Sequence, residues 1–519
     1  MGRASHRKRK HQNFSRLEAH TKEGSVLKSP FLSLNMHTMS WMNDSAPEML
    51  WAFLVASLFD RCNYLGCFRE IAEWSSKNLN TENPIDSEGA FQSDAIPDQT
   101  RLSELSVELL KEFVEIIARH PLGYAALRPL LLYESLPGRT NWKNLLQIEP
   151  YTSDWETVRK ASIEMFDHQS EVSTDIRWLK VLTTMLSGKI KFLPQMRGKV
   201  EEIFNFPRKG DLREVRPSIR SMEGMLRRPQ ASKWVIDFWT ESYERTDCID
   251  PTSMDDYPPS AASSLSPKQI MDARLAIISG FHNHTKTTGI DARLEGVTGL
   301  CLYGIALILE LQFYRTDSLI TGRLILRTLV EACITLKYLV AKNNDALWMS
   351  WRVYGNGQAK LAFLKAEEYS EDVPSFIEPD ELEALANEDH WMEFQNIDVG
   401  HWDKSTLRNL AIDAGMKDIY DRYYQWTSTF SHGHWCATRD VNFIICHNPL
   451  HRVHRIPRLV HRSANSVLED AVSLMNLMVD EFEKVLGESH GTIPRLTLQE
   501  PNEEQEPKPD QREKQGGLG

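Results

Sequence analysis

Several features that identify common protein classes are missing from this sequence. Its seven cysteines include no CxxC pair and have no regular spacing, and several lie in apolar runs, where cysteine behaves as a small hydrophobic residue. Such usage is typical of a reducing compartment, so we expect a cytoplasmic protein. The formal net charge of -12 disfavours a general nucleic-acid coat, although a local basic patch could still bind RNA.

Membrane and secretion signals are also lacking. The most apolar run, Val297 to Leu309, is short and is closed by Glu310, so we expect a core helix and no contact with a membrane. The N-terminus is basic but has no apolar segment, which excludes a secretory signal. No phosphate loop, nucleophile elbow, dinucleotide fingerprint or paired-carboxylate spacing is present. Common enzyme classes are therefore disfavoured, and we expect no cofactor.

What the sequence does contain is helical periodicity. Apolar residues recur at helical spacing from Pro47 to Ser76 and from Thr100 to His120, and no run alternates as a strand would. Further helices are predicted at 154–168, 172–187, 194–204 and 230–245. The predicted fold class is all-α.

A stretch rich in proline, serine and aspartate, Asp247 to Pro267, marks the clearest domain boundary. The helix after it has Ser266 as its N-cap, Pro267 in its first turn and Gln269 to complete a capping box. We therefore predict two helical domains joined by a linker. The predicted segments are a disordered basic tail (1–30), an N-terminal helical domain (31–246), the linker (247–266), a C-terminal helical bundle (267–487) and a disordered acidic tail (488–519).

The helix predicted from Asp317 to Lys342 is apolar nearly all round, yet three charged residues line one face. Arg323, Arg327 and Glu331 recur every four residues. Buried charges are costly unless they are paired, and Glu331 can pair with Arg327. Two interpretations stay open: a structural ion-pair network, which we favour, or a pocket in which arginine binds a phosphate or carboxylate.

A second feature is the segment from Lys417 to His432, which predicts a helix that ends at Gly433. Tyr424, Ser428 and Ser431 or His432 fall on one face of it. His432 lies in the last turn, where the helix dipole favours its protonated form. It can act as a helix cap or as a chemical group beside hydroxyls.

Histidines crowd the region after this helix and raise the question of a metal site. His447, His451 and His454 would share a face of a helix, but Pro449 and Pro457 disfavour a helix there. We therefore predict no metal ligands in this region.

A basic run, 208–228, is the candidate for RNA binding. Arg216 and Arg220 lie one helical turn apart, a geometry that could follow a phosphate backbone. The alternative, which we favour, is a solvated face that pairs with acidic neighbours. The candidate RNA-binding residues are Arg213, Arg216, Arg220, Arg227 and Arg228.

Together, the Arg327 to Glu331 pair, Tyr424 and the sequence from Ser431 to Gly433 resemble the bacterial domain of unknown function 5677, over roughly residues 270–487. The resemblance implies an all-helical fold and no established activity. Such domains are loosely similar to the HEPN group, many of which are metal-independent ribonucleases in bacterial conflict systems. The arginine-to-histidine motif of those enzymes has one counterpart here, Arg455 to His461, and Pro457 interrupts it.

Two functions follow as hypotheses. We favour a binding or interaction protein, with a role in phage defence, whose partner is RNA, another protein or a second copy of the chain. The alternative is a metal-independent ribonuclease, in which His432 is the general acid or base and Arg323 or Arg327 stabilises phosphate charge. The candidate catalytic residues are His432, Arg323, Arg327, Glu331, Ser431 and Tyr424.

Overall fold

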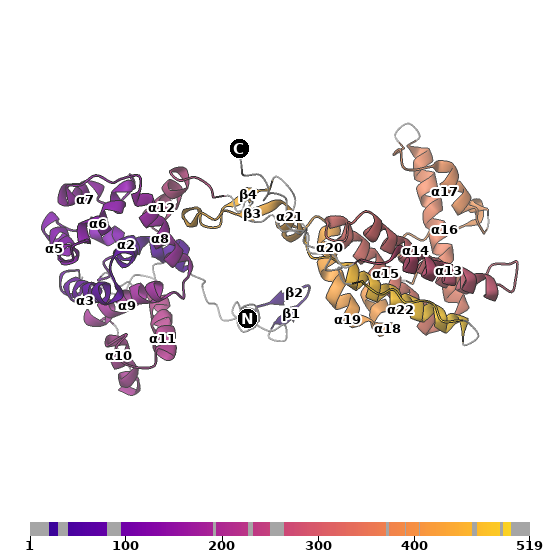
Figure 1. The fold of residues 1–519 in the computed structure, drawn as a ribbon, viewed down its shortest axis with the longest axis horizontal. Helices are drawn as coiled ribbons and strands as arrows, with labels where there is room; N and C mark the ends of the chain where they lie inside the picture. Colours follow the sequence, from indigo (N-terminus) through magenta and orange to yellow (C-terminus); the bar gives the residue numbers. More distant parts are fainter. Residues whose placement is uncertain are drawn as a thin grey trace, which may run out of the picture. The chain divides into compact units, whose positions relative to one another are not determined.

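A computed structural model of the chain has two compact helical units (Figure 1). Unit 1 comprises Met1–Asp250 and Ile445–His454, and unit 2 comprises Pro251–Ile444 and Arg455–Gly519. Helices dominate both units, which confirms the all-α class. The residues that the structure describes are 20–29, 40–79, 95–189, 194–226, 232–249, 264–369, 373–389, 391–403, 405–458, 464–487 and 491–499.

Unit 1 is a cluster of short helices around an aromatic-rich core, in which Trp51, Trp142 and Phe238 are fully buried. A short segment from late in the chain completes this core, because Leu450 is also fully buried in it. The α-helices of unit 1 are α2 (Leu50–Leu58), α3 (Arg61–Asn78), α4 (Gln99–Ser103), α5 (Val107–Ala118), α6 (Gly123–Leu127), α7 (Arg139–Leu146), α8 (Asp154–Phe166), α9 (Glu171–Leu186), α10 (Arg197–Phe204), α11 (Leu212–Met225) and α12 (Lys233–Glu244).

The two longest helices predicted in this part of the chain are each interrupted. Asp60 separates α2 from α3 and caps α3 by accepting a hydrogen bond from the backbone N–H of Asn63 at 3.0 Å. Ser106 separates α4 from α5 in the same way, through the N–H of Leu109 at 3.3 Å. A side-chain oxygen that satisfies the first N–H groups of a helix starts a new one. Apolar periodicity continues across both breaks and does not reveal them.

The central helix of unit 1 carries buried charge. Asp175 of α9 is fully buried and accepts hydrogen bonds from Arg61 Nε at 2.9 Å and from the Tyr64 hydroxyl at 2.8 Å. One turn and a half later, Lys180 forms an ion pair with Glu223 of α11. Such pairs tie helices together, because removing one partner would leave the other charged in the core.

Unit 2 is built on long helices, of which α14, α15 and α22 pack side by side (Figure 1). Gly304 permits the close approach of α14 to α22: a Cβ atom there would lie 2.7 Å from Met475 Sδ. The helices of unit 2 are α13 (Pro267–His284), α14 (Ala292–Phe313), α15 (Ile320–Lys342), α16 (Asp345–Glu368), α17 (Pro379–Ala386), η8 (Met392–Phe394), α18 (Leu407–Asp413), α19 (Lys417–Ile419), η9 (Tyr420–Tyr424), α20 (Gln425–Ser431), α21 (Trp435–Asn442) and α22 (Leu468–Leu486).

Helix α14 is longer than the apolar run that predicts it. Its 22 residues are enough, by length and composition, to cross a membrane, and among the described residues it alone passes that test. In the structure 56% of its most apolar window is buried, and it packs against α13, α15 and α22. That environment is the one we predicted, the core of a helical domain.

The predicted tails and linker need three corrections. Residues Thr21–Glu23 and Val26–Lys28 form an antiparallel hairpin (β1 and β2), so part of the predicted N-terminal tail has regular structure. Ile493 and Leu496 are buried in the core of unit 2, so the predicted C-terminal tail begins too early. Ser266 is the N-cap of α13 as predicted, but its side chain makes no capping hydrogen bond. Residues 250–263 of the linker lie outside the described residues.

Candidate functional site

Arg327 of α15 is the centre of the predicted charged face. Its Nε donates to Glu331 Oε1 at 2.9 Å, its Nη1 to Ser428 Oγ at 3.1 Å and its Nη2 to the Tyr424 hydroxyl at 3.0 Å. The guanidinium carbon also lies 4.8 Å from the centroid of the Tyr424 ring, which stacks on Tyr420. Arg327 therefore joins α15 to the 417–432 segment through both of its terminal nitrogens, while its Nε pairs with Glu331 on the same helix.

The 417–432 segment follows the predicted bounds, but with an unpredicted turn inside it. A π-helical turn, η9 (Tyr420–Tyr424), separates α19 from α20. Such turns insert one residue and change which side chains face a neighbour. The segment ends as predicted: His432 is the C-cap residue of α20, and Gly433 follows with a φ of 58°.

Arg323, one turn before Arg327, has a different environment. Its side chain donates to the backbone oxygens of Asp317 at 3.0 Å and Leu319 at 3.2 Å, and to that of Asn465. It is 7% exposed, and burial lowers its pKa, although Asp317 and Asp440 act in the opposite direction. Arg323 thus provides hydrogen-bond donors for carbonyl oxygens at the start of α15 and in the segment before α22. It thereby fixes the backbone of both.

The structure separates the remaining candidates from this cluster. Ser431 and His432 are exposed, and the ring of His432 stacks on His434 with centroids 5.7 Å apart. Arg327 pairs with Glu331 as the four-residue spacing predicts, and the structure brings Tyr424 and Ser428 to the same guanidinium. The hydrogen bonds of Arg327 connect helices, which is a structural role, and His432 lies on the exposed surface apart from them.

A small polar cavity of about 350 Å³ lies beside Arg323. Trp426, Asp440 and Asp470 contribute to its lining, and the Tyr423 hydroxyl donates to Asp470 Oδ1 at 2.7 Å. Burial, together with this hydrogen bond and the charge of Asp470, raises the pKa of Tyr423 to about 12. The volume is at the lower end of the range for small-molecule sites.

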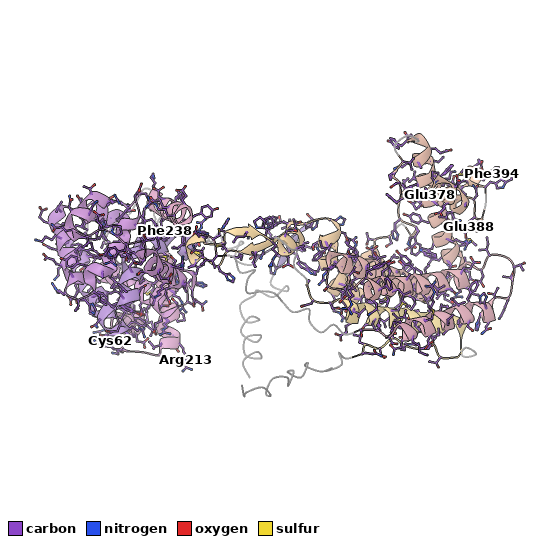
Figure 2. All side chains as sticks on the ribbon, turned by 45° about the horizontal axis from the view of Figure 1, so that its top comes forward. Cys62, Arg213, Phe238, Glu378, Glu388 and Phe394 are labelled. Atoms are coloured by element: carbon purple, nitrogen blue, oxygen red, sulfur yellow. The ribbon has the colours of Figure 1, made fainter. Side chains whose placement is uncertain are left out.

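The basic run in unit 1 pairs largely with acidic neighbours. Arg213 contacts Asp211 at 3.0 Å, Arg216 forms an ion pair with Glu171, and Arg220 donates to the Thr174 hydroxyl at 3.2 Å. The Arg213 side chain, labelled in Figure 2, is 90% exposed, against 29% for that of Arg216. Arg227 and Arg228 lie outside the described residues. The geometry is that of a paired, solvated face.

The feature that sequence reasoning missed is the arm of unit 2, residues 345–403, which contains α16 and α17. The start of α16 packs against α14, and the rest of the arm extends away from the other helices of its unit (Figures 1 and 2). The arm has fourteen acidic residues and three basic ones, a formal charge of -11. It also carries large apolar side chains that are exposed to solvent. Their exposed fractions are 83% for Phe376, 73% for Trp391, 82% for Phe394 and 84% for Val399.

The arm is held together by its few basic side chains. Arg352 of α16 makes a two-point contact with Asp389 at 2.7 and 2.9 Å, and this hydrogen bonding raises the pKa of Arg352. Lys360 donates to the backbone oxygen of Gln395 at 2.7 Å. Two of the three basic residues are thus used inside the arm. The clustering of acidic residues could have been read from the sequence, whereas the exposure of the rings could not.

Comparison with known proteins gives one match. The model of a family of unknown function (DUF5677) matches residues 303–448, a range that contains α15, the arm and the 417–432 segment. No curated protein and no solved structure matches the chain.

Proposed function

We propose that this protein is an interaction protein. Its arm binds a partner protein, and the segment of the partner that contacts the arm is basic and also carries apolar side chains. The observation that supports the proposal is the exposure of Phe376, Trp391 and Phe394 on a strongly acidic surface. Exposed rings surrounded by charge mark protein-binding surfaces. Aromatic residues are also common among the few side chains that dominate binding energy.

The charge of the arm limits the choice of partner. A surface with a formal charge of -11 repels RNA, whose backbone is anionic, and it repels a second copy of itself. It attracts a basic partner and increases the rate of encounter at low salt. RNA and a second copy are therefore alternative outcomes of the test below.

The arginine face supports a binding role over catalysis. A ribonuclease site needs an arginine that is available to the developing phosphate charge. Arg323 donates to three backbone oxygens, and Arg327 donates to Glu331, Ser428 and Tyr424. Both side chains already have protein partners that hold helices in place. The role in phage defence stays a prediction.

The test selects peptides from a random library against the immobilised full chain and then measures the affinity of one selected peptide by fluorescence anisotropy. We expect enrichment of lysine or arginine together with aromatic or branched apolar residues, and binding that weakens as salt increases. Loss of a buried aromatic anchor costs about 2 kcal/mol, which is roughly 30-fold in Kd. We therefore expect Phe376→Ala or Phe394→Ala to weaken binding by about that factor.

The matched control is Phe313→Ala, because Phe313 is 78% exposed but lies at the end of α14, outside the arm. Its affinity should stay within about twofold of that of the unchanged protein. Selection of acidic peptides, or equal losses in the Phe313 and Phe394 variants, would refute the proposal. If the chain binds RNA, or associates with itself, and the arm variants abolish that binding, then the partner is RNA or a second copy and not a basic protein.

A further inference from the structure

Unit 1 contains a cluster of sulfur and imidazole groups that the candidate site does not use. It is formed where Cys248, which follows α12, meets the segment Ile445–His454. The potential ligand atoms of four side chains all lie within 4.8 Å of one another. These side chains are Cys248, Cys446, His451 and His454.

The distances within the cluster match those around a tetrahedral zinc ion. Zinc binds sulfur at about 2.3 Å and nitrogen at about 2.0–2.1 Å, so the sulfur and nitrogen ligands of a tetrahedral site are about 3.6 Å apart. In the structure, His451 Nδ1 lies 3.5 Å from Cys248 Sγ and 3.4 Å from Cys446 Sγ. His454 Nδ1 lies 3.7 Å from Cys248 Sγ. One ring nitrogen thus faces two sulfur atoms, as it does when an ion lies between them.

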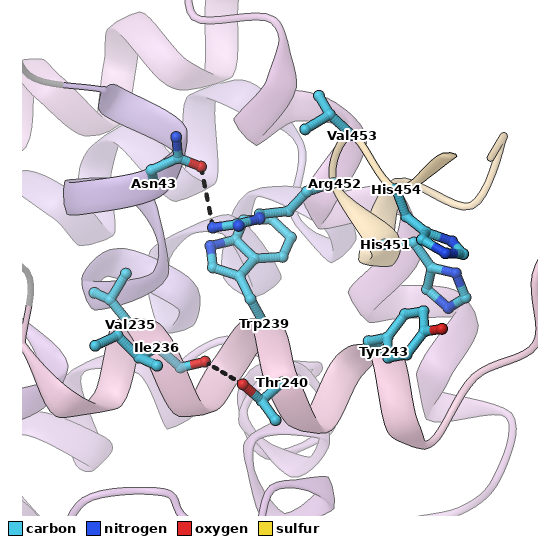
Figure 3. Close-up of a pocket in the computed structure, with 10 residues that line it drawn as sticks. All are labelled: Asn43, Val235, Ile236, Trp239, Thr240, Tyr243, His451, Arg452, Val453 and His454. Carbon is cyan, nitrogen blue, oxygen red and sulfur yellow. Dashed lines mark hydrogen bonds between the residues drawn. The ribbon is translucent and has the colours of Figure 1, made fainter. Parts of the chain in front are cut away.

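A tight turn places the two histidines side by side. The N–H of His454 donates to the carbonyl oxygen of His451 at 2.9 Å, which closes a four-residue turn. Arg452, its second residue, has φ 53° and ψ -118°, a conformation that normally requires glycine. The turn brings the ring centroids of His451 and His454 to 5.8 Å, and both rings lie beside Tyr243 (Figure 3).

Two backbone N–H groups point at the sulfur of Cys446. The N–H groups of Ile249 and Asn448 both donate to Cys446 Sγ at 3.4 Å. A cysteine binds a metal as its thiolate, which accepts such hydrogen bonds. Cys446 is 4% exposed, so such a thiolate needs a positive partner close by.

The outer nitrogen of His451 is held as in many metal sites. His451 Nε2 lies 3.0 Å from the carbonyl oxygen of Thr246. A hydrogen bond from Nε2 to a carbonyl oxygen leaves the lone pair on Nδ1, which faces the sulfurs, and histidine ligands of metals are usually oriented in this way. Asn448 supports the same segment, because its Nδ2 donates to the carbonyl oxygen of Asp247 at 2.9 Å.

From this geometry we propose that the four side chains bind one structural Zn²⁺ ion. Two thiolates and two neutral imidazoles give a neutral site with a divalent ion and complete a tetrahedral shell. All four ligands come from the protein, which is the arrangement of structural rather than catalytic zinc. The ion holds Ile445–His454 against the rest of unit 1, where Leu450 enters the core.

The proposal revises the expectation that this histidine-rich region holds no metal. That expectation considered a helix with His447, His451 and His454 on one face. The structure has instead a short 3-10 helix, η10 (Pro449–His451), and a strand, β4 (Arg455–Pro457). His447 is exposed and is not a member of the cluster. The two sulfur ligands come from distant parts of the chain, so their spacing does not resemble a zinc motif.

The experiment measures zinc in the full-length protein, purified without chelator, by mass spectrometry of the metal. We expect one zinc per chain, and tetrahedral, sulfur-ligated absorption bands when Co²⁺ replaces it. Removing a residue that positions a metal ligand lowers metal affinity about 10–100-fold, so Asn448→Ala should lower zinc affinity by about that factor. Cys248→Ser and His454→Ala remove ligands themselves and should lower zinc affinity more than about 100-fold. The controls His447→Ala and Cys62→Ser, which change residues outside the cluster, should retain one zinc per chain.

Alkylation provides a second readout that does not require the variants to fold. Cys62, Cys248 and Cys436 are all exposed, so all three should react with the alkylating agent when no zinc is bound. With zinc bound, Cys248 should react more slowly than Cys62 and Cys436, and a chelator should remove this protection. A chain that neither contains zinc nor takes it up would overturn the proposal. So would equal zinc loss in the control variants.

Discussion

Replacing Arg327 by alanine should loosen the 417–432 segment without unfolding unit 2. The ion pair with Glu331 is exposed on the glutamate side and contributes roughly 0.3–0.5 kcal/mol. The hydrogen bonds to Ser428 and Tyr424 contribute about 1 kcal/mol each. The expected loss is therefore about 2 kcal/mol. It should be local, because η9 and α20 pack against α15.

The assay is hydrogen–deuterium exchange of the backbone amides of residues 417–431, measured on the full chain. A loss of about 2 kcal/mol corresponds to roughly 30-fold faster exchange there, and Tyr424→Phe should give roughly fivefold. Glu331→Ala should give about twofold or less, since it removes the ion pair alone. Thr321→Ala is the control, because Thr321 is an exposed residue of the same helix.

The reasoning is refuted if Arg327→Ala leaves these amides unchanged while Glu331→Ala accelerates them. In that case the contacts of Arg327 would not hold the 417–432 segment against α15. Equal acceleration throughout unit 2 would show that Arg327 supports the whole core.

Two further predictions concern the same region. The pKa of Tyr423, raised from 10.0 to about 12, means that its stabilising contribution is present below pH 10 and is lost between pH 10 and 12. Ultraviolet titration of tyrosine should show Asp470→Asn lowering this pKa, and an unchanged titration would contradict the role of Asp470. For the ribonuclease alternative, we expect a mixed RNA pool to stay intact with and without chelator. Chelator-resistant cleavage that His432→Ala abolishes would make His432 catalytic and displace the interaction role.

Helix positions were largely predictable in this chain, and helix breaks were not. The periodicity of apolar residues placed α8, α9 and α12 within a few residues of their observed bounds. The breaks at Asp60 and Ser106 depend on capping hydrogen bonds that compete with continuation of the helix. Local sequence permits both outcomes, and packing around the break selects one.

The charged face shows the same division. Four-residue spacing correctly paired Arg327 with Glu331, because side chains one turn apart on a helix are always neighbours. The spacing could not show that Arg323 would bind backbone oxygens of Asp317, Leu319 and Asn465. The last of these contacts joins parts of the chain that only the tertiary fold brings together.

The sequence by itself determined the all-helical class, the buried character of α14 and the place of the Gly433 helix end, since each follows from periodicity, composition or the conformational freedom of one residue. Only the tertiary structure decided which polar groups meet. It left the rings of Phe376 and Phe394 exposed on the arm, and it brought Cys248 to Cys446 and His451. Periodicity describes one segment at a time, whereas a binding surface or a metal site requires contacts between segments that lie far apart in the chain.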